Sequence, residues 1–271
     1  MFVAHNENMA FFKEIFTAFS QYIESNEFLG IVDLGSLDIN GGPQVLVGKD
    51  IRYVGIDLGD GPNVDLVRPI ELIDLPSLSF SMTISSEMLE HNPFWREALF
   101  QMVRLTSLGG LVVWTCAGIG RPEHGTTRSD GGHSAPLVTG MGREYYKNIS
   151  AEEAANAFDH ELWYECWNYF ENFQAKDTYF IGLRKGSSQE NRRTFSEINE
   201  KFSKMYVSRP TLRSFFHKYH FNNMVEMCLR AARWRRYVRV YSPLVLKFYQ
   251  RNKFKKMKSR LKYFLNSVRA Q

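Results

Sequence analysis

The chain has 271 residues, of which 44% are apolar and 23% are charged, so it is long enough to bury a hydrophobic core without disulfides or metals. Its formal net charge of +5 conceals two regions of opposite sign. All 29 acidic residues lie at or before Glu226, and residues 1–226 carry a net charge of −9. Residues 227–271 carry 14 basic residues and no acid. The sequence therefore joins an acidic body to a strongly basic tail.

Cysteine usage and hydropathy exclude several classes of protein. The three cysteines are far apart and form no CxxC pair, which argues against a disulfide framework and favours a reduced compartment. The first residues lack the basic-then-apolar layout of a signal peptide. No run approaches the ~18–20 apolar residues of a membrane span. We therefore expect a cytoplasmic protein, with the inner face of the membrane as an alternative location.

Apolar patterning in the first half predicts strands that alternate with helices. A helix is expected over residues 9–25, where apolar residues recur at spacings of three and four. A second helix is expected near 93–105. Short apolar runs predict strands at residues 28–35, 51–58, 80–86 and 111–118, the last of them after a Gly109-Gly110 turn.

The second half begins with a long polar segment. Residues 118–148 are rich in Gly, Pro, Ser and Thr, which predicts a substrate loop or lid. Ser150 and Glu153 form a capping box at the start of a helix. Runs at 162–173 and 178–185 predict an antiparallel hairpin, and 186–193 predicts a linker to further helices. The expected fold is α/β, with a doubly wound, mostly parallel sheet closed by the hairpin and a basic helical C-terminal extension.

Open doubly wound sheets bind ligands beyond the carboxyl ends of their strands, so the residues at these positions are site candidates. The first strand is followed by Asp33-Leu34-Gly35-Ser36 and a turn at Asn40-Gly41. Asp57 ends the second strand, 24 residues after Asp33, and its carboxylate suits the two hydroxyls of a ribose. Glu71 and Glu87 follow later in the chain.

The ordered series of motifs resembles class I S-adenosylmethionine-dependent methyltransferases, and most closely the methyltransferase type 11 group. The series is D-L-G-S-L-D-I-N-G, V-G-I-D, D-L-P, I-S-S-E-M-L-E-H and R-L-T-S-L-G-G-L, within residues 29–117. The segments R-P-E-H-G-T and Y-Y-K-N-I-S are similar to a bacterial subset encoded near surface-glycan genes. The resemblance implies a Rossmann-like methyltransferase fold over residues 1–190 and S-adenosylmethionine as cofactor, with residues 191–271 as an extension.

The resemblance also implies roles for the residues of the first motif. Asp33 and Gly35 would lie beside the methionine part of the cofactor, in a loop that includes Ser36 and Asn40. Asp57 would bind the ribose. The usual G-x-G-x-G of the family becomes Gly35-Ser36-Leu37-Asp38-Ile39, with two glycines replaced.

Later motifs would contact the other parts of the cofactor. By the same resemblance, Leu58 would pack against the adenine and Glu71 would lie near the adenine amino group. Leu72 would offer backbone contacts, and Glu87 would face the end that donates the methyl group.

Methyl transfer is an in-line displacement, which requires alignment of donor and acceptor and, for a hydroxyl acceptor, a base. The candidate bases are His124, His91 and Glu87. The residues expected to contact the acceptor are Arg121, His124, Tyr145, Tyr146 and Asn148. The histidines and acids lack the sequence spacing of a metal site, so no metal is expected.

The predicted activity is O-methylation of a sugar or of a glycan or surface-polysaccharide precursor. Methylation of a small metabolite or of RNA is an alternative, and a non-catalytic binding or scaffold protein is another. A nicotinamide dehydrogenase is disfavoured because G-x-G-x-x-G is absent. For the basic, aromatic tail, packing on the acidic body or on another copy and contact with an anionic membrane surface stay open, and nucleic acid is less favoured.

Overall fold

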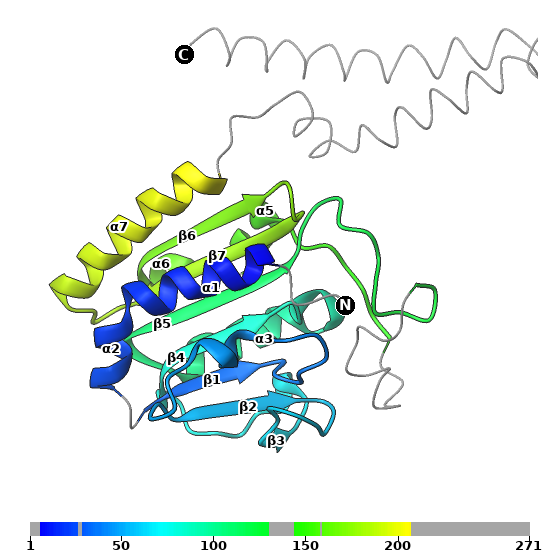
Figure 1. Cartoon of the computed structure of the whole chain (residues 1–271), viewed down its shortest axis with the longest axis horizontal. Coiled ribbons are helices and arrows are strands. Elements are labelled where there is room, and N and C mark those ends of the chain that lie inside the picture. The colour runs from blue at the N-terminus through cyan, green and yellow to red at the C-terminus, as the bar shows by residue number, and fades with distance from the viewer. Residues whose placement is uncertain (1–5, 27–28, 130–143, 158, 207–271) are drawn as a thin grey trace, which may run out of the picture. The chain divides into compact units, whose positions relative to one another are not determined.

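A computed structural model gives the fold and describes residues 6–26, 29–129, 144–157 and 159–206. In this part of the chain, seven strands form one sheet in the order β3-β2-β1-β4-β5-β7-β6 (Figure 1). The strands are β1 (Ile31–Leu34), β2 (Tyr53–Asp57), β3 (Leu66–Val67), β4 (Phe80–Ser86), β5 (Thr106–Ala117), β6 (Tyr164–Asn172) and β7 (Asp177–Arg184). Strands β1 to β5 are mutually parallel, and β7 is antiparallel to both β5 and β6. The predicted fold class, including the closing hairpin, is confirmed.

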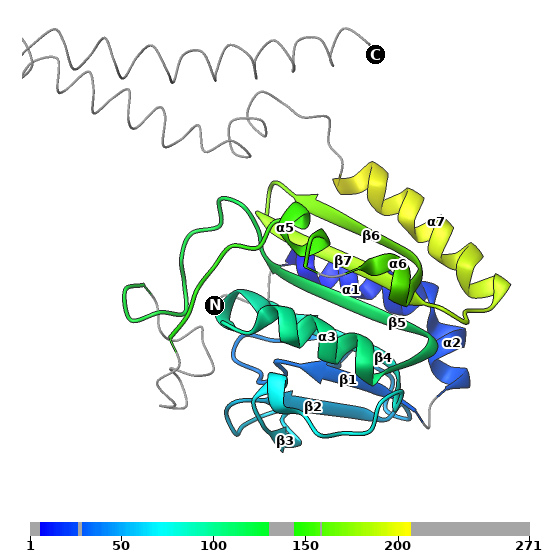
Figure 2. The same cartoon turned by 180° about the vertical axis from the view of Figure 1, so that it is seen from behind.

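Helices cover both faces of the sheet. One face carries α1 (Asn6–Ala18), α2 (Ser20–Ser25) and α7 (Gln189–Tyr206) (Figure 1). The opposite face carries α3 (Trp95–Leu105), α5 (Ala151–Ala155) and α6 (His160–Trp163) (Figure 2). Three short 3-10 helices interrupt the loops, namely η1 (Pro43–Leu46), η2 (Ile70–Leu72) and η3 (Leu89–His91).

Each face of the sheet has its own hydrophobic core. On the α1 side, Phe11 stacks on Tyr179 of β7 and contacts Phe202 of α7, with ring centroids 4.7 and 4.8 Å apart. On the α3 side, the core includes Trp95 and Trp114, which are each 1% exposed. Trp163, Trp167 and Tyr169 pack against this second core, as their alternation in the sequence predicts.

The N-terminal helix and the fourth strand differ from their predicted forms. The helix expected over 9–25 is divided at Phe19, whose φ of −104° and ψ of 18° leave helical geometry while its side chain stays buried. The predicted Gly109-Gly110 turn lies inside β5, where a bulge places Leu111 opposite Met82. A Cβ on Gly110 would lie 2.6 Å from the Ser81 carbonyl oxygen, so this close approach explains the glycine.

The N-terminal ends of α5 and α7 test two predictions, of which one is correct and one is wrong. Ser150 Oγ accepts a hydrogen bond from the Glu153 amide at 3.0 Å, which confirms the predicted cap. The predicted linker at 186–193 is wrong, because α7 begins at Gln189 and Ser188 Oγ accepts from the Asn191 amide at 3.0 Å. The short strand β3 and helix α6 were not predicted. Both are too short to show periodicity.

Some predictions lie outside the described residues. They concern the tip of the substrate loop at 130–143 and the basic tail at 227–271. None of the described helices combines the length and the apolar character that a membrane crossing requires.

Candidate functional site

The order of the strands brings the predicted site residues to one edge of the sheet. Strand β1 pairs in parallel with β2 on one side and with β4 on the other. The strand order therefore runs one way from β1 to β3 and the opposite way from β1 to β4 and β5. The carboxyl ends of β1, β2, β4 and β5 therefore lie together, with Asp33, Asp57 and Glu87 at or near them. This is the topological switch point where open α/β sheets bind ligands.

The loop after β1 turns sharply at Gly35. Its φ of +91° favours glycine, and a Cβ at this position would lie 2.4 Å from the Cβ and Cγ of Met88. The amides of Gly35 and Ser36 both donate to the Ile56 carbonyl, at 2.8 and 3.2 Å. The loop is thereby held against β2 and the segment after β4, and no other residue type fits at position 35 without movement.

Asp57 links the loops that follow β1 and β2. One carboxylate oxygen accepts from the Leu37 amide at 3.0 Å, and the other accepts from the amides of Leu58 and Gly59 at 2.7 and 3.3 Å. Asp57 is 6% exposed, and burial raises its pKa while these three donors oppose the rise. The side chain is positioned by the backbone before any ligand arrives.

Asp33 is buried in β1 and accepts a hydrogen bond from the Tyr53 hydroxyl through Oδ2. Burial raises the pKa of Asp33 to about 7, with a further contribution from the Asp57 charge and opposition from Tyr53. Among the described residues, Asp33 Oδ1 and the buried Ser36 Oγ have no hydrogen-bond partner. Two polar atoms beside Gly35 thus remain for a polar ligand.

The other predicted cofactor residues lie in the segments that follow β1, β2 and β3. Asn40 and Leu58 are half-buried in the loops after β1 and β2. Glu71 lies in η2, where its backbone carbonyl accepts from Gln101 of α3 at 3.3 Å. Leu72 is 66% exposed, and its amide donates to the Pro69 carbonyl at 3.0 Å. The roles assigned to these four residues stay predictions.

Glu87 begins the segment after β4 with a φ of +54°, a conformation that non-glycine residues rarely adopt. Asn8 of α1 donates to Glu87 Oε1 at 3.1 Å and to Thr115 Oγ1 at 2.8 Å, and is fully buried. Burial raises the pKa of Glu87, and the positive charge of Arg121 opposes the rise. The N-terminal helix therefore helps to position the predicted methyl-donor end of the site.

A second buried acid, Glu90, lies three residues further on in η3. It is 0% exposed, and neither carboxylate oxygen has a hydrogen-bond partner among the described residues. Burial raises the pKa of Glu90 well above its usual range, and the Glu87 charge raises it further. A buried carboxyl is costly in its charged form, so a nearby cation would stabilise the Glu90 carboxylate.

Two of the candidate bases meet beside Glu90. The rings of His91 and His124 lie 5.0 Å apart, and Tyr146 lies 5.5 Å from His91 and 5.0 Å from His124. The Pro122 carbonyl oxygen accepts a hydrogen bond from the Tyr146 hydroxyl at 3.0 Å and lies 3.1 Å from His124 Nδ1. A carboxylate oxygen of Glu90 and one ring nitrogen each of His91 and His124 lie within 4.8 Å of one another.

The remaining predicted acceptor residues have local partners. Arg121 forms an ion pair with Asp177 of β7 at 2.6 Å and donates to the Ala175 carbonyl at 2.8 Å. Asn148 donates to the carbonyls of Gly118 and Arg121 at 2.6 and 2.9 Å. These contacts anchor the loop after β5 to the sheet. Tyr145 is half-buried in the same loop.

Sequence reasoning missed four residues of this site: Asn8, Tyr53, Glu90 and Asp177. Asn8 and Asp177 reach the site through the arrangement of α1 and β7, which no local pattern reveals. Tyr53 looks like an ordinary strand residue. Glu90 had a signal, because two acids three residues apart in E-M-L-E-H follow a buried strand.

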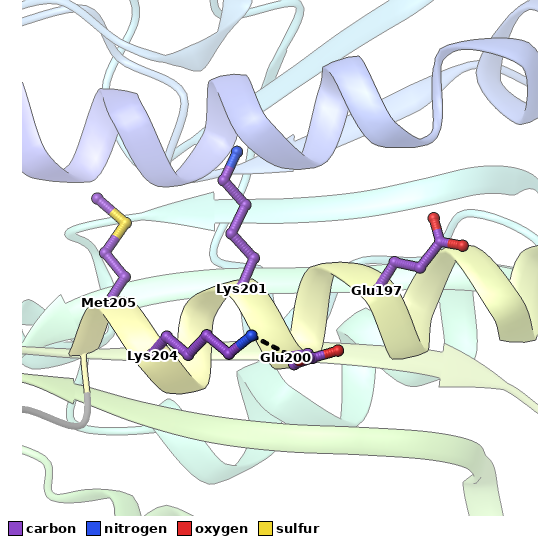
Figure 3. Close-up of a pocket in the computed structure, with 5 residues that line it drawn as sticks. All are labelled: Glu197, Glu200, Lys201, Lys204 and Met205. Atoms are coloured by element: carbon purple, nitrogen blue, oxygen red, sulfur yellow. Dashed lines mark hydrogen bonds and ion pairs between the residues drawn. The ribbon is translucent and has the colours of Figure 1, made fainter.

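Two surface hollows lie away from the predicted site residues. One, on the outer side of α7, is lined by Glu197, Glu200, Lys201, Lys204 and Met205 (Figure 3). There Lys204 pairs with Glu200 at 2.6 Å, and Lys201 reaches Glu14 of α1 at 2.5 Å. The other is lined by α1, α2 and the η1 segment, including Phe16, Ile23 and Leu46. Neither hollow is lined by a residue of the predicted site.

Comparisons with known proteins agree with the fold. No protein-family model matches the chain, and no curated protein sequence matches it. Similar solved structures include the CurJ carbon methyltransferase, with 14% identity, coverage of 58% of this chain and 48% of that one, and a TM-score of 0.40. A methyltransferase of Thermotoga maritima, described as a possible histamine N-methyltransferase, is 12% identical. The match covers 65% of this chain and 99% of that one, with a TM-score of 0.39.

A third structure is the 1,6-didemethyltoxoflavin-N1-methyltransferase of Burkholderia thailandensis, with bound 1,6-didemethyltoxoflavin and S-adenosylhomocysteine. It has 11% identity, coverages of 68% and 92%, and a TM-score of 0.39. This chain spans about half the length of the CurJ structure. Because the identities are 14% or less and the TM-scores are 0.40 or less, the function has to be argued from the site itself.

Proposed function

We propose that this chain is an S-adenosylmethionine-dependent methyltransferase. The observation that carries the proposal is the switch-point edge, where β2, β1 and β4 lie side by side in that order. Asp57 ends β2, Gly35 follows β1 and Glu87 follows β4, so the three residues can line a cofactor extended across the edge. The motif series in the sequence supports the same assignment.

The residues at this edge fit the cofactor. The turn at Gly35 leaves no room for a side chain, so the backbone there can approach a ligand closely. Asp33 Oδ1 and Ser36 Oγ are buried polar atoms suited to the amino acid part of the cofactor. An aspartate carboxylate accepts up to about four hydrogen bonds, so Asp57 has capacity for one ribose hydroxyl besides its three amides.

When bound, S-adenosylmethionine supplies an electrophilic methyl group whose bonding electrons stay on its sulfur. The protein then needs to orient an acceptor and remove its proton. Glu87, His91 and His124 are the residues of this edge that can take a proton from an acceptor hydroxyl. The raised pKa of Glu87 makes it a stronger base than an ordinary carboxylate.

Titration calorimetry with S-adenosylmethionine and the purified full chain tests the proposal. We expect one binding site per chain, with a weaker affinity in the Asp57→Ala variant. The exposed Asp60 provides a matched control, because Asp60→Ala removes an acid three residues away. A flat titration with the intact chain would contradict the proposal.

For the acceptor, we propose a hydroxyl of a sugar or glycan precursor, on the resemblance of R-P-E-H-G-T and Y-Y-K-N-I-S to a bacterial glycan-associated subset. A screen with S-adenosylmethionine labelled on its methyl group and a panel of nucleotide sugars tests this. Transfer to RNA or to small metabolites in parallel reactions, without transfer to any sugar, would reject it. The proposed cytoplasmic location and contact of the basic tail with an anionic membrane surface belong to the same hypothesis.

A further inference from the structure

Glu90, His91 and His124 form a cluster that the cofactor site does not need. The first two are neighbours in η3, while His124 comes from the loop after β5. One ligating atom of each residue lies within 4.8 Å of the other two. Glu90 is fully buried, and both of its carboxylate oxygens lack hydrogen-bond partners among the described residues. A buried carboxylate of this kind calls for a cation.

We propose that Glu90, His91 and His124 bind one divalent transition-metal ion of the zinc class. Two imidazoles and one carboxylate form a mixed nitrogen and oxygen donor set, which suits Zn²⁺, Co²⁺ or Fe²⁺ better than Mg²⁺ or Ca²⁺. Three protein ligands leave at least one position open, as in catalytic zinc sites. The sequence suggested no such site because 33 residues separate the two histidines.

The geometry requires a small adjustment to hold the ion. Ligand atoms about 2.1 Å from a tetrahedral zinc lie about 3.4 Å from one another. The ligating atoms therefore have to approach one another by up to about 1.4 Å, which requires rotation of the His91 and His124 side chains. His124 is only half-buried, so its side chain has room for this movement. A bound ion would compensate the charge of the buried Glu90 carboxylate.

The role of the ion rests on the proposed methyl transfer, whereas its binding does not. A hydroxyl that occupies the open position is acidified by the ion. Its proton passes to the Glu87 carboxylate, the hydroxyl oxygen forms its bond to the methyl carbon, and the electrons of the carbon–sulfur bond remain on sulfur. His91 and His124 then serve as ligands, and Glu87 is the base.

Cobalt titration of the untagged, chelator-treated full chain tests the site. We expect visible d–d absorption that saturates at one Co²⁺ per chain and disappears when one equivalent of Zn²⁺ is added. His124→Gln should weaken Zn²⁺ binding, measured by calorimetry, at least 100-fold. Glu123→Gln is the matched control, because Glu123 lies in the same loop but pairs with Arg128 at 2.7 Å and should leave Zn²⁺ affinity unchanged.

A third variant, Glu90→Gln, removes the charge of the proposed carboxylate ligand. Because Glu90 is buried, the circular dichroism spectrum of this variant must match that of the unchanged chain before the two Zn²⁺ affinities are compared. Weak binding at several sites, or binding that His124→Gln does not reduce, would overturn the proposal. Titration of S-adenosylmethionine with and without chelator separates the two hypotheses. Cofactor binding without metal binding rejects only the metal site, and metal binding without cofactor binding rejects the proposed function while leaving the metal site standing.

Discussion

The two halves of the switch-point edge differ in how their buried acids are hydrogen-bonded. In the half that follows β1 and β2, Asp57 accepts hydrogen bonds from three backbone amides. In the half that follows β4 and β5, Glu90 has no donor among the described residues. Burial raises the pKa of both side chains, and the charge of Glu87 adds to the rise at Glu90.

This difference separates a preorganised half from one that needs a partner. Backbone amides are fixed by the fold, so Asp57 keeps its position and its capacity to accept ligand hydroxyls. Glu90 and Glu87 repel each other, and their charges can be balanced by protons, by Arg121 or by a cation. The β1–β2 half therefore suits a constant cofactor, and the β4–β5 half suits chemistry in which charge changes.

Replacing His124 should have the largest effect and should affect only the β4–β5 half. We expect His124→Ala to lower turnover on the real acceptor by about 100-fold or more, because a base or a ligand of the acceptor is lost. Affinity for S-adenosylmethionine should change by less than about twofold. Steady-state kinetics and calorimetry measure the two quantities. Full activity of His124→Ala would show that the imidazole has no role.

Replacing Asp57 should have the converse effect. We expect Asp57→Ala to weaken S-adenosylmethionine binding at least tenfold, because ribose contacts are lost and the Leu37, Leu58 and Gly59 amides lose their acceptor. Asp57→Asn keeps one acceptor oxygen, so its affinity for S-adenosylmethionine should lie between those of Asp57→Ala and the unchanged chain. If Asp57→Ala binds the cofactor as tightly as Asp60→Ala, the preorganised half does not bind it.

Removing Asn8 tests how α1 supports the β4–β5 half. Asn8→Ala should lower the free energy of unfolding by about 1–3 kcal/mol, because buried hydrogen bonds to Glu87 and Thr115 are lost. Urea denaturation measures the change, and the exposed Asn6→Ala in the same helix turn is the control. Asn8→Asp should be more harmful at pH 8 than at pH 5, since it adds a carboxylate beside Glu87. Equal stability of Asn8→Ala and Asn6→Ala would mean that α1 is held by its aromatic contacts alone.

The last expected effect is a pH dependence of stability that comes from Asp33 and is modest per pH unit. Its pKa rises from an ordinary 3.8 to about 7 on folding, so between these values the folded chain holds a proton that the unfolded chain has lost. The free energy of unfolding should thus fall as pH rises from about 4 to 7, by about 1 kcal/mol per pH unit from this group. Asp33→Asn should flatten that slope in urea titrations at several pH values, and Asp60→Asn should not. An unchanged slope in Asp33→Asn would place the titration elsewhere.

The sequence predicted every strand of the described sheet except the short β3, and the acids at the strand ends, because both depend on local patterns. Apolar runs followed by Asp33, Asp57 and Glu87 are visible along the chain. The bonding of those acids is not, since it depends on which backbone amides the loops bring near. Helix α7 was predicted to start too late because the polar segment around Ser188 resembles a linker as much as a helix start. The cluster at Glu90 depends on a contact between η3 and a loop that starts 27 residues after η3.

The contact between Gly35 and Met88 has a consequence for the order in which ligands bind. Met88 is the residue immediately before η3, the helix that carries Glu90 and His91. A ligand that moves the loop at Gly35 presses on Met88 and so shifts the residues that would receive the acceptor. We therefore expect a compulsory order in steady-state kinetics, with S-adenosylmethionine bound first and the acceptor second. Product-inhibition patterns, with S-adenosylhomocysteine competitive against the cofactor alone, are the expected signature.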